Sequence, residues 1–267
     1  MKPAPFDYVR AGSLDEAARL LQQGGADARP LAGGQSLGPM LNLRLAQPRL
    51  LVDLTCIPEL GGIEHGTDAI VLGAAITHAA IEDRRAGDIG QGVLSRIAAG
   101  IAYRAVRNRG TIGGSLCHAD PAADWVSALT ALGASVITHK AGNDGRMIAM
   151  RDFITGAFMT ALEPGEIARA VSIPRLSSDA RWGWYKVCRK PGEFASTIAA
   201  VLDDRRRGVC RAVVGATGDR PVILEAPNAS TELLDDALAK RLAHLDGIER
   251  GVHRVALRRA LSMMVRE

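Results

Sequence analysis

The chain has 267 residues, of which 47% are hydrophobic and 23% charged, and its formal net charge is +4 at pH 7. This balance is typical of an ordinary soluble globular protein with room for two or three compact units. Aromatic residues make up only 4%, which argues against a stacking platform for single-stranded nucleic acid, while the mildly basic charge suits an anionic ligand equally well.

The first predicted unit covers residues 1–55 and combines a helix with short strands. Apolar residues recur at helical spacing over residues 13–23, where Ser13 is the expected N-cap and Glu16 completes a capping box. Glycines 24 and 25 end this helix. We expect strands over residues 28–32 and 50–54 and a helical turn over residues 39–45.

The second predicted unit covers residues 56–176. Its expected strands are residues 69–73, 134–138, 147–150 and 167–173, with a tight turn at 143–145. Its expected helices are a short one capped by Thr77, then residues 92–99 and 121–132, where Pro121 would occupy the first turn.

The third predicted unit covers residues 177–267 and combines antiparallel strands with helices. Strands are expected over 182–189, 197–202 and 209–216, and helices over 231–245 and 252–265. Two tryptophans at 182 and 184 favour core packing. The charged run at 204–207 favours a solvated turn, with a docking patch for an acidic partner as the alternative.

Two segments that each contain a Gly-Gly pair are the main candidates for a ligand-binding site. One covers residues 32–38, and the other covers residues 107–116 and continues to Asp124. Glycine lets the backbone adopt positive φ and approach a ligand closely, and successive N–H groups in such a turn form a concave anion site. Either segment alone would be a simple turn. Together they suggest two walls of one diphosphate site.

Several other kinds of binding or catalytic site are excluded or disfavoured because their motifs are absent. The Rossmann Gly-x-Gly-x-x-Gly, the P-loop, His-Glu-x-x-His and Gly-x-Ser-x-Gly are all absent from the sequence. The four cysteines form no Cys-x-x-Cys pair, which argues against an iron–sulfur cluster or structural zinc in this chain. They favour reduced thiols in a cytoplasmic protein. No signal peptide or membrane span is expected, because no apolar run approaches ~18 residues.

A few polar residues near the second segment are candidates for ligand contacts. His118 could touch a cofactor or simply bond to backbone. Asp120 and Asp124 could favour a helix N-terminus, or Asp124 could accept a hydrogen bond from a ribose or ribityl hydroxyl. Lys186 could reach a cofactor edge or lie on the surface.

Taken together, these motifs resemble the FAD-binding medium subunit of molybdenum hydroxylases, the carbon monoxide dehydrogenase and xanthine dehydrogenase family. The matching stretches are residues 1–8, 31–37, 42–45, 51–54, 107–116, 118–124, 158–166 and 255–261. The resemblance implies an α+β protein, with an FAD-binding domain of the vanillyl-alcohol-oxidase type in two α/β subdomains and a C-terminal domain of antiparallel strands and helices.

The resemblance also implies the residues that bind the cofactor. They are Ala32, Gly33, Gly34, Gln35, Ser36, Leu37, Ile101, Thr111, Gly113, Gly114, Ser115, His118, Asp124 and Lys186. Three positions depart from the family pattern: Gln35 replaces a histidine of many relatives, Ser115 an asparagine, and Cys117 a small alanine. The first two replacements keep hydrogen-bonding capacity.

Electron transfer is the function that the resemblance implies. A large partner with molybdopterin would hydroxylate a substrate, a small partner with 2Fe-2S clusters would pass electrons to FAD here, and an external acceptor would receive them. The implied assembly is a dimer of heterotrimers, and no residue is expected to act as a catalytic acid or base. The alternatives are a stand-alone FAD oxidoreductase and a non-enzymatic flavin-binding protein.

Overall fold

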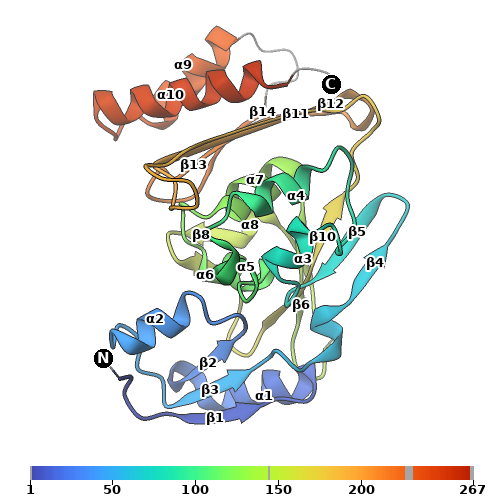
Figure 1. Ribbon diagram of the computed structural model, residues 1–267, viewed down its shortest axis with the longest axis vertical. Helices are drawn as coiled ribbons and strands as arrows, with labels where there is room; N and C mark the ends of the chain where they lie inside the picture. The colour runs from blue at the N-terminus through green and yellow to red at the C-terminus, as the bar shows by residue number, and fades with distance from the viewer. Residues whose placement is uncertain (1, 144, 226–230, 265–267) are drawn as a thin grey trace.

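The computed structural model describes residues 2–143, 145–225 and 231–264. Its N-terminal part, at the bottom of Figure 1, is a three-stranded parallel sheet in the order β1-β3-β2. The strands are β1 (Asp7–Arg10), β2 (Ala28–Leu31) and β3 (Leu50–Asp53), and the helices beside them are α1 (Leu14–Gly24), η1 (Gly25–Asp27) and α2 (Leu37–Asn42). Ala17, Ala18 and Leu21 bury the apolar stripe of α1 against this sheet.

The middle part is built on a five-stranded antiparallel sheet in the order β4-β5-β10-β6-β7. Its strands are β4 (Ile63–His65), β5 (Ala69–Gly73), β6 (Ser135–His139), β7 (Met147–Ala149) and β10 (Ile167–Pro174), and a separate hairpin pairs β8 (Ile154–Gly156) with β9 (Met159–Thr160). Its helices are η2 (Pro58–Gly61), α3 (His78–Glu82), α4 (Val93–Ala99), α5 (Arg104–Arg107), α6 (Ile112–His118), α7 (Asp124–Leu132) and α8 (Met150–Phe153).

Helix α7 is the centre of the main core, because all nine of its residues are buried. A helix that is buried on every side needs packing partners all round. Figure 1 shows it between the middle sheet and the C-terminal sheet above it. Trp125, in its first turn, is fully buried.

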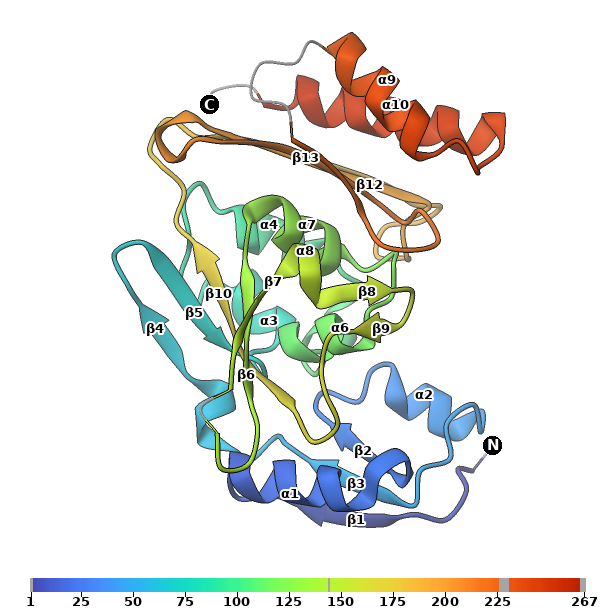
Figure 2. The same ribbon diagram turned by 180° about the vertical axis from the view of Figure 1, so that it is seen from behind.

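The C-terminal part is a four-stranded antiparallel sheet in the order β11-β12-β13-β14, covered on its outer face by two helices (Figures 1 and 2). Its strands are β11 (Arg181–Val187), β12 (Thr197–Asp204), β13 (Val209–Gly215) and β14 (Val222–Glu225), with η3 (Arg205–Arg207), α9 (Thr231–Arg241) and α10 (Gly247–Ser262). All eight residues of β12 are buried, because α7 packs on one face of the strand and α10 on the other.

The α+β fold class is therefore confirmed, while several predicted element boundaries are wrong. Helix α7 begins at Asp124, because residues 121–123 form a turn in which the Asp120 carboxylate accepts from the Ala122 N–H at 2.8 Å. Helix α10 begins at Gly247, because Asp246 and Glu249 form a capping box. At α1, the capping box is incomplete: Ser13 accepts from the Glu16 N–H, but the Glu16 carboxylate accepts from the Gly12 N–H.

The predicted turn at 143–145 falls partly outside the described residues, as does the end of the predicted last helix at residue 265. In the part of the chain that is described, no helix combines the length and apolar content needed to cross a bilayer.

Candidate functional site

The two Gly-Gly segments meet in space, as the sequence predicts. A Cβ atom on Gly33 would lie 2.7 Å from the carbonyl carbon of Arg109 and 2.9 Å from Cα of Gly110. Side chains do not tolerate such distances, so only glycine permits this backbone contact. Residues 33–36 therefore lie directly beside the entry to the second segment.

The second segment is fixed against residues 74–78 by backbone hydrogen bonds. The His78 N–H donates to the Gly110 carbonyl at 2.9 Å, and the Gly113 N–H donates to the Ala74 carbonyl at 2.9 Å. A Cβ atom on Gly113 would lie 2.7 Å from that Ala74 oxygen. Glycine is required here for close packing.

The Gly113–Gly114 pair is not in the loop conformation that the sequence suggests. Both residues lie in the first turn of α6, whose N-cap Thr111 accepts from the Gly114 N–H at 3.0 Å. Positive φ occurs instead in the first segment, at Gly34 with φ 70°. The expectation of a loop at 111–115 fails because the Thr111 cap and the packing on Ala74 compensate for the weak helix propensity of glycine.

The first segment presents free hydrogen-bond donors. Among the described residues, no acceptor pairs with the backbone N–H groups of residues 33–36, which lead into the N-terminus of α2. The Gln35 side chain turns back to donate to the Gly33 carbonyl at 3.1 Å. Successive free N–H groups beside a positive-φ glycine form an anion-binding concavity. Thr111 and the start of α6 lie next to it.

Asp124 and Lys186 form a buried ion pair, which neither residue's own sequence context reveals. The Lys186 Nζ donates to Oδ2 of Asp124 at 2.9 Å and to the Gly100 carbonyl at 3.2 Å. Burial raises the pKa of Asp124, and the Lys186 ammonium opposes that rise. The second carboxylate oxygen, Oδ1, is buried without a partner among the described residues. It retains capacity to accept a hydrogen bond.

Known proteins match this chain over most of its length. The family described as "FAD binding domain in molybdopterin dehydrogenase" matches residues 4–176. The carbon monoxide dehydrogenase medium chain of Afipia carboxidovorans is 38% identical over 244 residues, covering 90% of this chain and 83% of that one. Subunit alpha of the 6-hydroxypseudooxynicotine dehydrogenase complex of Paenarthrobacter nicotinovorans is 36% identical over 241 residues, covering 90% and 81%.

A solved structure agrees with these matches. The carbon monoxide dehydrogenase of Hydrogenophaga pseudoflava superposes with a TM-score of 0.90 at 29% identity, over 99% of this chain and 98% of that one. This chain belongs to the family of FAD-binding domains of molybdopterin dehydrogenases. It is an oxidoreductase subunit of the molybdenum hydroxylase type, and FAD is its cofactor.

The described residues fit FAD on their own chemistry. A pyrophosphate needs convergent donors, and the free N–H groups of residues 33–36 provide them. The N–H groups of Gly113 and Gly114, at the start of α6, are already paired within the protein. The unpartnered Oδ1 of Asp124 suits a hydroxyl of the sugar or ribityl chain.

The other predicted cofactor contacts, His118 and Ile101, lie at the end of α6 and in the segment before α5. His118 ends α6, and its ring packs against Phe158 in a tilted arrangement, with centroids 5.3 Å apart and an interplanar angle of 57°. Ile101 packs against the main core in the segment that precedes α5. Burial raises the pKa of the neighbouring Cys117 thiol to about 12, so this thiol stays protonated and unreactive.

His78 lies against the second Gly-Gly segment, at a position that the sequence does not mark as functional. Its Nδ1 accepts from the Trp125 indole N–H at 3.1 Å, and its ring lies so close to Gly110 that a Cβ there would be 2.9 Å from Cδ2. Burial, and secondarily the charge of Arg107, lower the pKa of His78 to about 4. No local motif marks this histidine, because its partner is 47 residues away.

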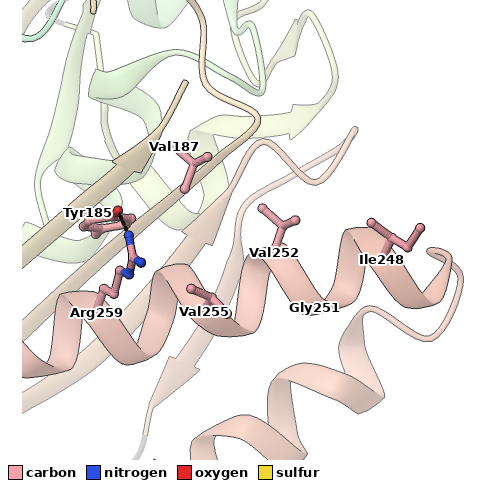
Figure 3. Close-up of a pocket in the computed structure, with 7 residues that line it drawn as sticks. All are labelled: Tyr185, Val187, Ile248, Gly251, Val252, Val255 and Arg259. Carbon is pink, nitrogen blue, oxygen red and sulfur yellow. Dashed lines mark hydrogen bonds between the residues drawn. The ribbon is translucent and has the colours of Figure 1, made fainter. Parts of the chain in front are cut away.

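An apolar groove of about 420 Å³ lies elsewhere, between β11 and α10 (Figure 3). Its lining residues are Tyr185, Val187, Ile248, Gly251, Val252, Val255 and Arg259. Tyr185 and Lys186 are neighbours on a strand, so their side chains point to opposite faces of the sheet. Because Lys186 faces Asp124, the groove is on the opposite side of the sheet from Asp124.

Proposed function

We propose that this chain transfers electrons through FAD, which residues 32–37 and 111–115 hold by its pyrophosphate. The backbone contact between Gly33 and Arg109 carries this proposal, because it brings the free N–H groups of the first segment to the second. FAD, when bound, supplies the redox chemistry by accepting electrons and releasing them as a pair.

The protein's own contribution is binding and orientation. Asp124 would accept from a ribityl or ribose hydroxyl through Oδ1, while Lys186 balances its charge through Oδ2. His118 and Ile101 would flank the flavin. No residue is assigned as a catalytic acid or base.

We infer that partner subunits supply and receive the electrons. Relatives carry the names medium chain, medium subunit and complex subunit alpha, which supports a large and a small partner subunit. We propose that the large subunit holds molybdopterin, that the small subunit holds 2Fe-2S clusters, and that the complex is a dimer of heterotrimers. Electrons would pass from the 2Fe-2S clusters through FAD to an external acceptor.

We further infer three units, residues 1–55, 56–176 and 177–267, of which the first two bind FAD. The distribution of the three large sheets supports this division, since β1–β3, β4–β10 and β11–β14 fall within the respective ranges.

The test is titration of the purified full chain with FAD. We expect saturable binding and a flavin absorption band at roughly 450 nm. We also expect no oxidation of organic substrates until the partner subunits are added. In Gly33→Ala, the new Cβ would separate the two segments, so FAD affinity should fall by about tenfold or more. Gly38→Ala is the matched control, because a Cβ at Gly38 meets nothing within 4 Å.

Two results would contradict the proposal. Unchanged FAD affinity in Gly33→Ala would remove the pyrophosphate assignment. Turnover of an organic substrate by the isolated chain would favour a stand-alone oxidoreductase, whereas an FAD that partner subunits cannot reduce would favour a flavin-binding protein without a redox role.

A further inference from the structure

Three consecutive carbonyl groups in the segment of residues 100–103 are held by two cationic side chains. The Lys186 Nζ donates to the Gly100 oxygen at 3.2 Å, and Nη1 of Arg107 donates to the oxygens of Ile101 and Ala102, both at 2.9 Å. The two cations come from different parts of the fold, β11 and α5. Hydrogen bonds from β11 and from α5 therefore fix the carbonyl groups of residues 100–102.

Each cation is itself fixed by an acid. Arg107 makes a bidentate pair with Glu82, with Nε–Oε2 at 2.7 Å and Nη2–Oε1 at 2.9 Å, and its side chain is only 11% exposed. The Arg107 guanidinium beside Glu82 lowers the pKa of that carboxyl. Lys186 is held by Asp124 through a single contact, Nζ–Oδ2 at 2.9 Å. Planar, bidentate pairing leaves the Arg107 guanidinium little freedom to turn.

These hydrogen bonds maintain an unusual backbone conformation in the segment. Ala102 has φ 44°, in the left-handed region that non-glycine residues rarely adopt. The hairpin between β11 and β12 packs closely against the same residue, since a Cβ on Gly192 would lie 2.5 Å from the Ala102 oxygen. Strain of this kind persists only where surrounding contacts impose it.

The same hydrogen bonds leave two backbone N–H groups of the segment free to donate. In a trans peptide, the C=O and N–H groups point to opposite sides of the chain. Because the oxygens of Ile101 and Ala102 turn toward Arg107, the N–H groups of Ala102 and Tyr103 point away from it. Neither N–H has an acceptor among the described residues.

We propose that Arg107 is a positioning residue for FAD: it fixes the segment 100–103 so that the N–H groups of Ala102 and Tyr103 donate to the flavin. This inference rests on the proposed function and adds to it a residue that does not touch the cofactor. Donors aimed at a flavin ring alter both its binding and its reduction potential.

The test compares three variants of the full chain. Arg107→Met removes both carbonyl contacts, whereas Arg107→Lys keeps a cation that can reach one oxygen. Arg104→Met is the matched control, because Arg104 lies on the same helix and also pairs with Glu82, at 2.9 Å, without touching residues 100–102. The measurements are the FAD dissociation constant, the absorption spectrum and reduction potential of the bound flavin, and the unfolding temperature.

We expect Arg107→Met to weaken FAD binding by about tenfold or more and to shift the potential and spectrum. Arg107→Lys should recover part of each change, and Arg104→Met should stay within roughly twofold of wild type. If Arg107→Met does not fold, Arg107→Lys decides alone: wild-type affinity, spectrum and potential would overturn the inference. A wild-type chain that fails to bind FAD would instead refute the proposed function.

Discussion

At the scale of single residues, His78 shows how burial converts a titratable group into a structural one. It accepts from Trp125 as a neutral imidazole and lies against Gly110, beside the proposed FAD site. Protonation would place an uncompensated charge in the core near Arg107, which is why its pKa falls to about 4.

This shift predicts a loss of stability in mild acid. The unfolded chain takes up a proton at His78 near pH 6.5, whereas the folded chain resists protonation until about pH 4. The contribution of this group is therefore fully present above 6.5 and declines by roughly 3 kcal/mol as the pH falls to 4. The measurement is the free energy of unfolding from urea titrations at pH 7 and pH 4.

The non-titrating variant His78→Gln should lose less stability than wild type over this interval. His244→Gln, at an exposed position, should follow wild type. Parallel losses in wild type and His78→Gln would show that the imidazole is not the source.

At the scale of elements, the contact of β11 with α10 depends on one glycine. A Cβ on Gly183 would lie 2.9 Å from the carbonyl carbon of Ala260 and closer still to its oxygen. The strand and helix therefore approach more closely than any side chain would allow.

Gly183→Ala should displace α10 and lower the free energy of unfolding by about 1–3 kcal/mol. Gly251→Ala, within α10 and with nothing within 4 Å of the added Cβ, should instead stabilise the helix by up to about 1 kcal/mol. Chemical denaturation of both variants measures the difference. Equal stability of wild type and Gly183→Ala would mean that the helix can shift without cost.

The sequence predicts elements well where one local pattern decides them. The apolar spacing of α1 and the Thr77 cap of α3, which accepts from the Ala80 N–H, are such cases. Helix α6 is missed because Gly113 and Gly114 disfavour a helix, and the Thr111 cap together with the distant Ala74 contact explains why one forms there.

The same limit applies to the candidate site. Asp124 and Lys186 are both recognisable as candidates from their motifs, but their pairing across 62 residues is not. Arg107 lies inside the most specific motif, yet its contacts with the carbonyls of residues 101 and 102 accompany a left-handed backbone at Ala102 that no spacing reveals.

At the scale of the whole molecule, the Asp124–Lys186 pair joins the C-terminal sheet to the FAD-binding part. Both side chains are about as buried as the core, with exposures of 7% and 10%. Removing one member leaves an uncompensated charge, which costs far more than a surface pair does.

Lys186→Met should therefore lower the free energy of unfolding by about 3–5 kcal/mol. Lys140→Met is the control: its 2.9 Å pair with Glu163 has exposures of 37% and 55%, so the loss should stay below about 1 kcal/mol. Adding Asp124→Asn to Lys186→Met should restore part of the stability, because the buried charge is gone. Similar losses in the two single variants would contradict a role for the buried pair.

Strand β12 separates two hydrophobic clusters, one on each face of the C-terminal sheet. Ala200 and Leu202 belong to the main core around α7, whereas Ala199 and Val201 belong to the cluster under α10. Inserting or deleting one amino acid in β12 would interchange the two sets. The neighbouring strand, where Lys186 pairs in register with Ile198, would lose its alignment as well. A length change in β12 would therefore disturb the position of Lys186, a proposed contact of the flavin, without altering that residue itself.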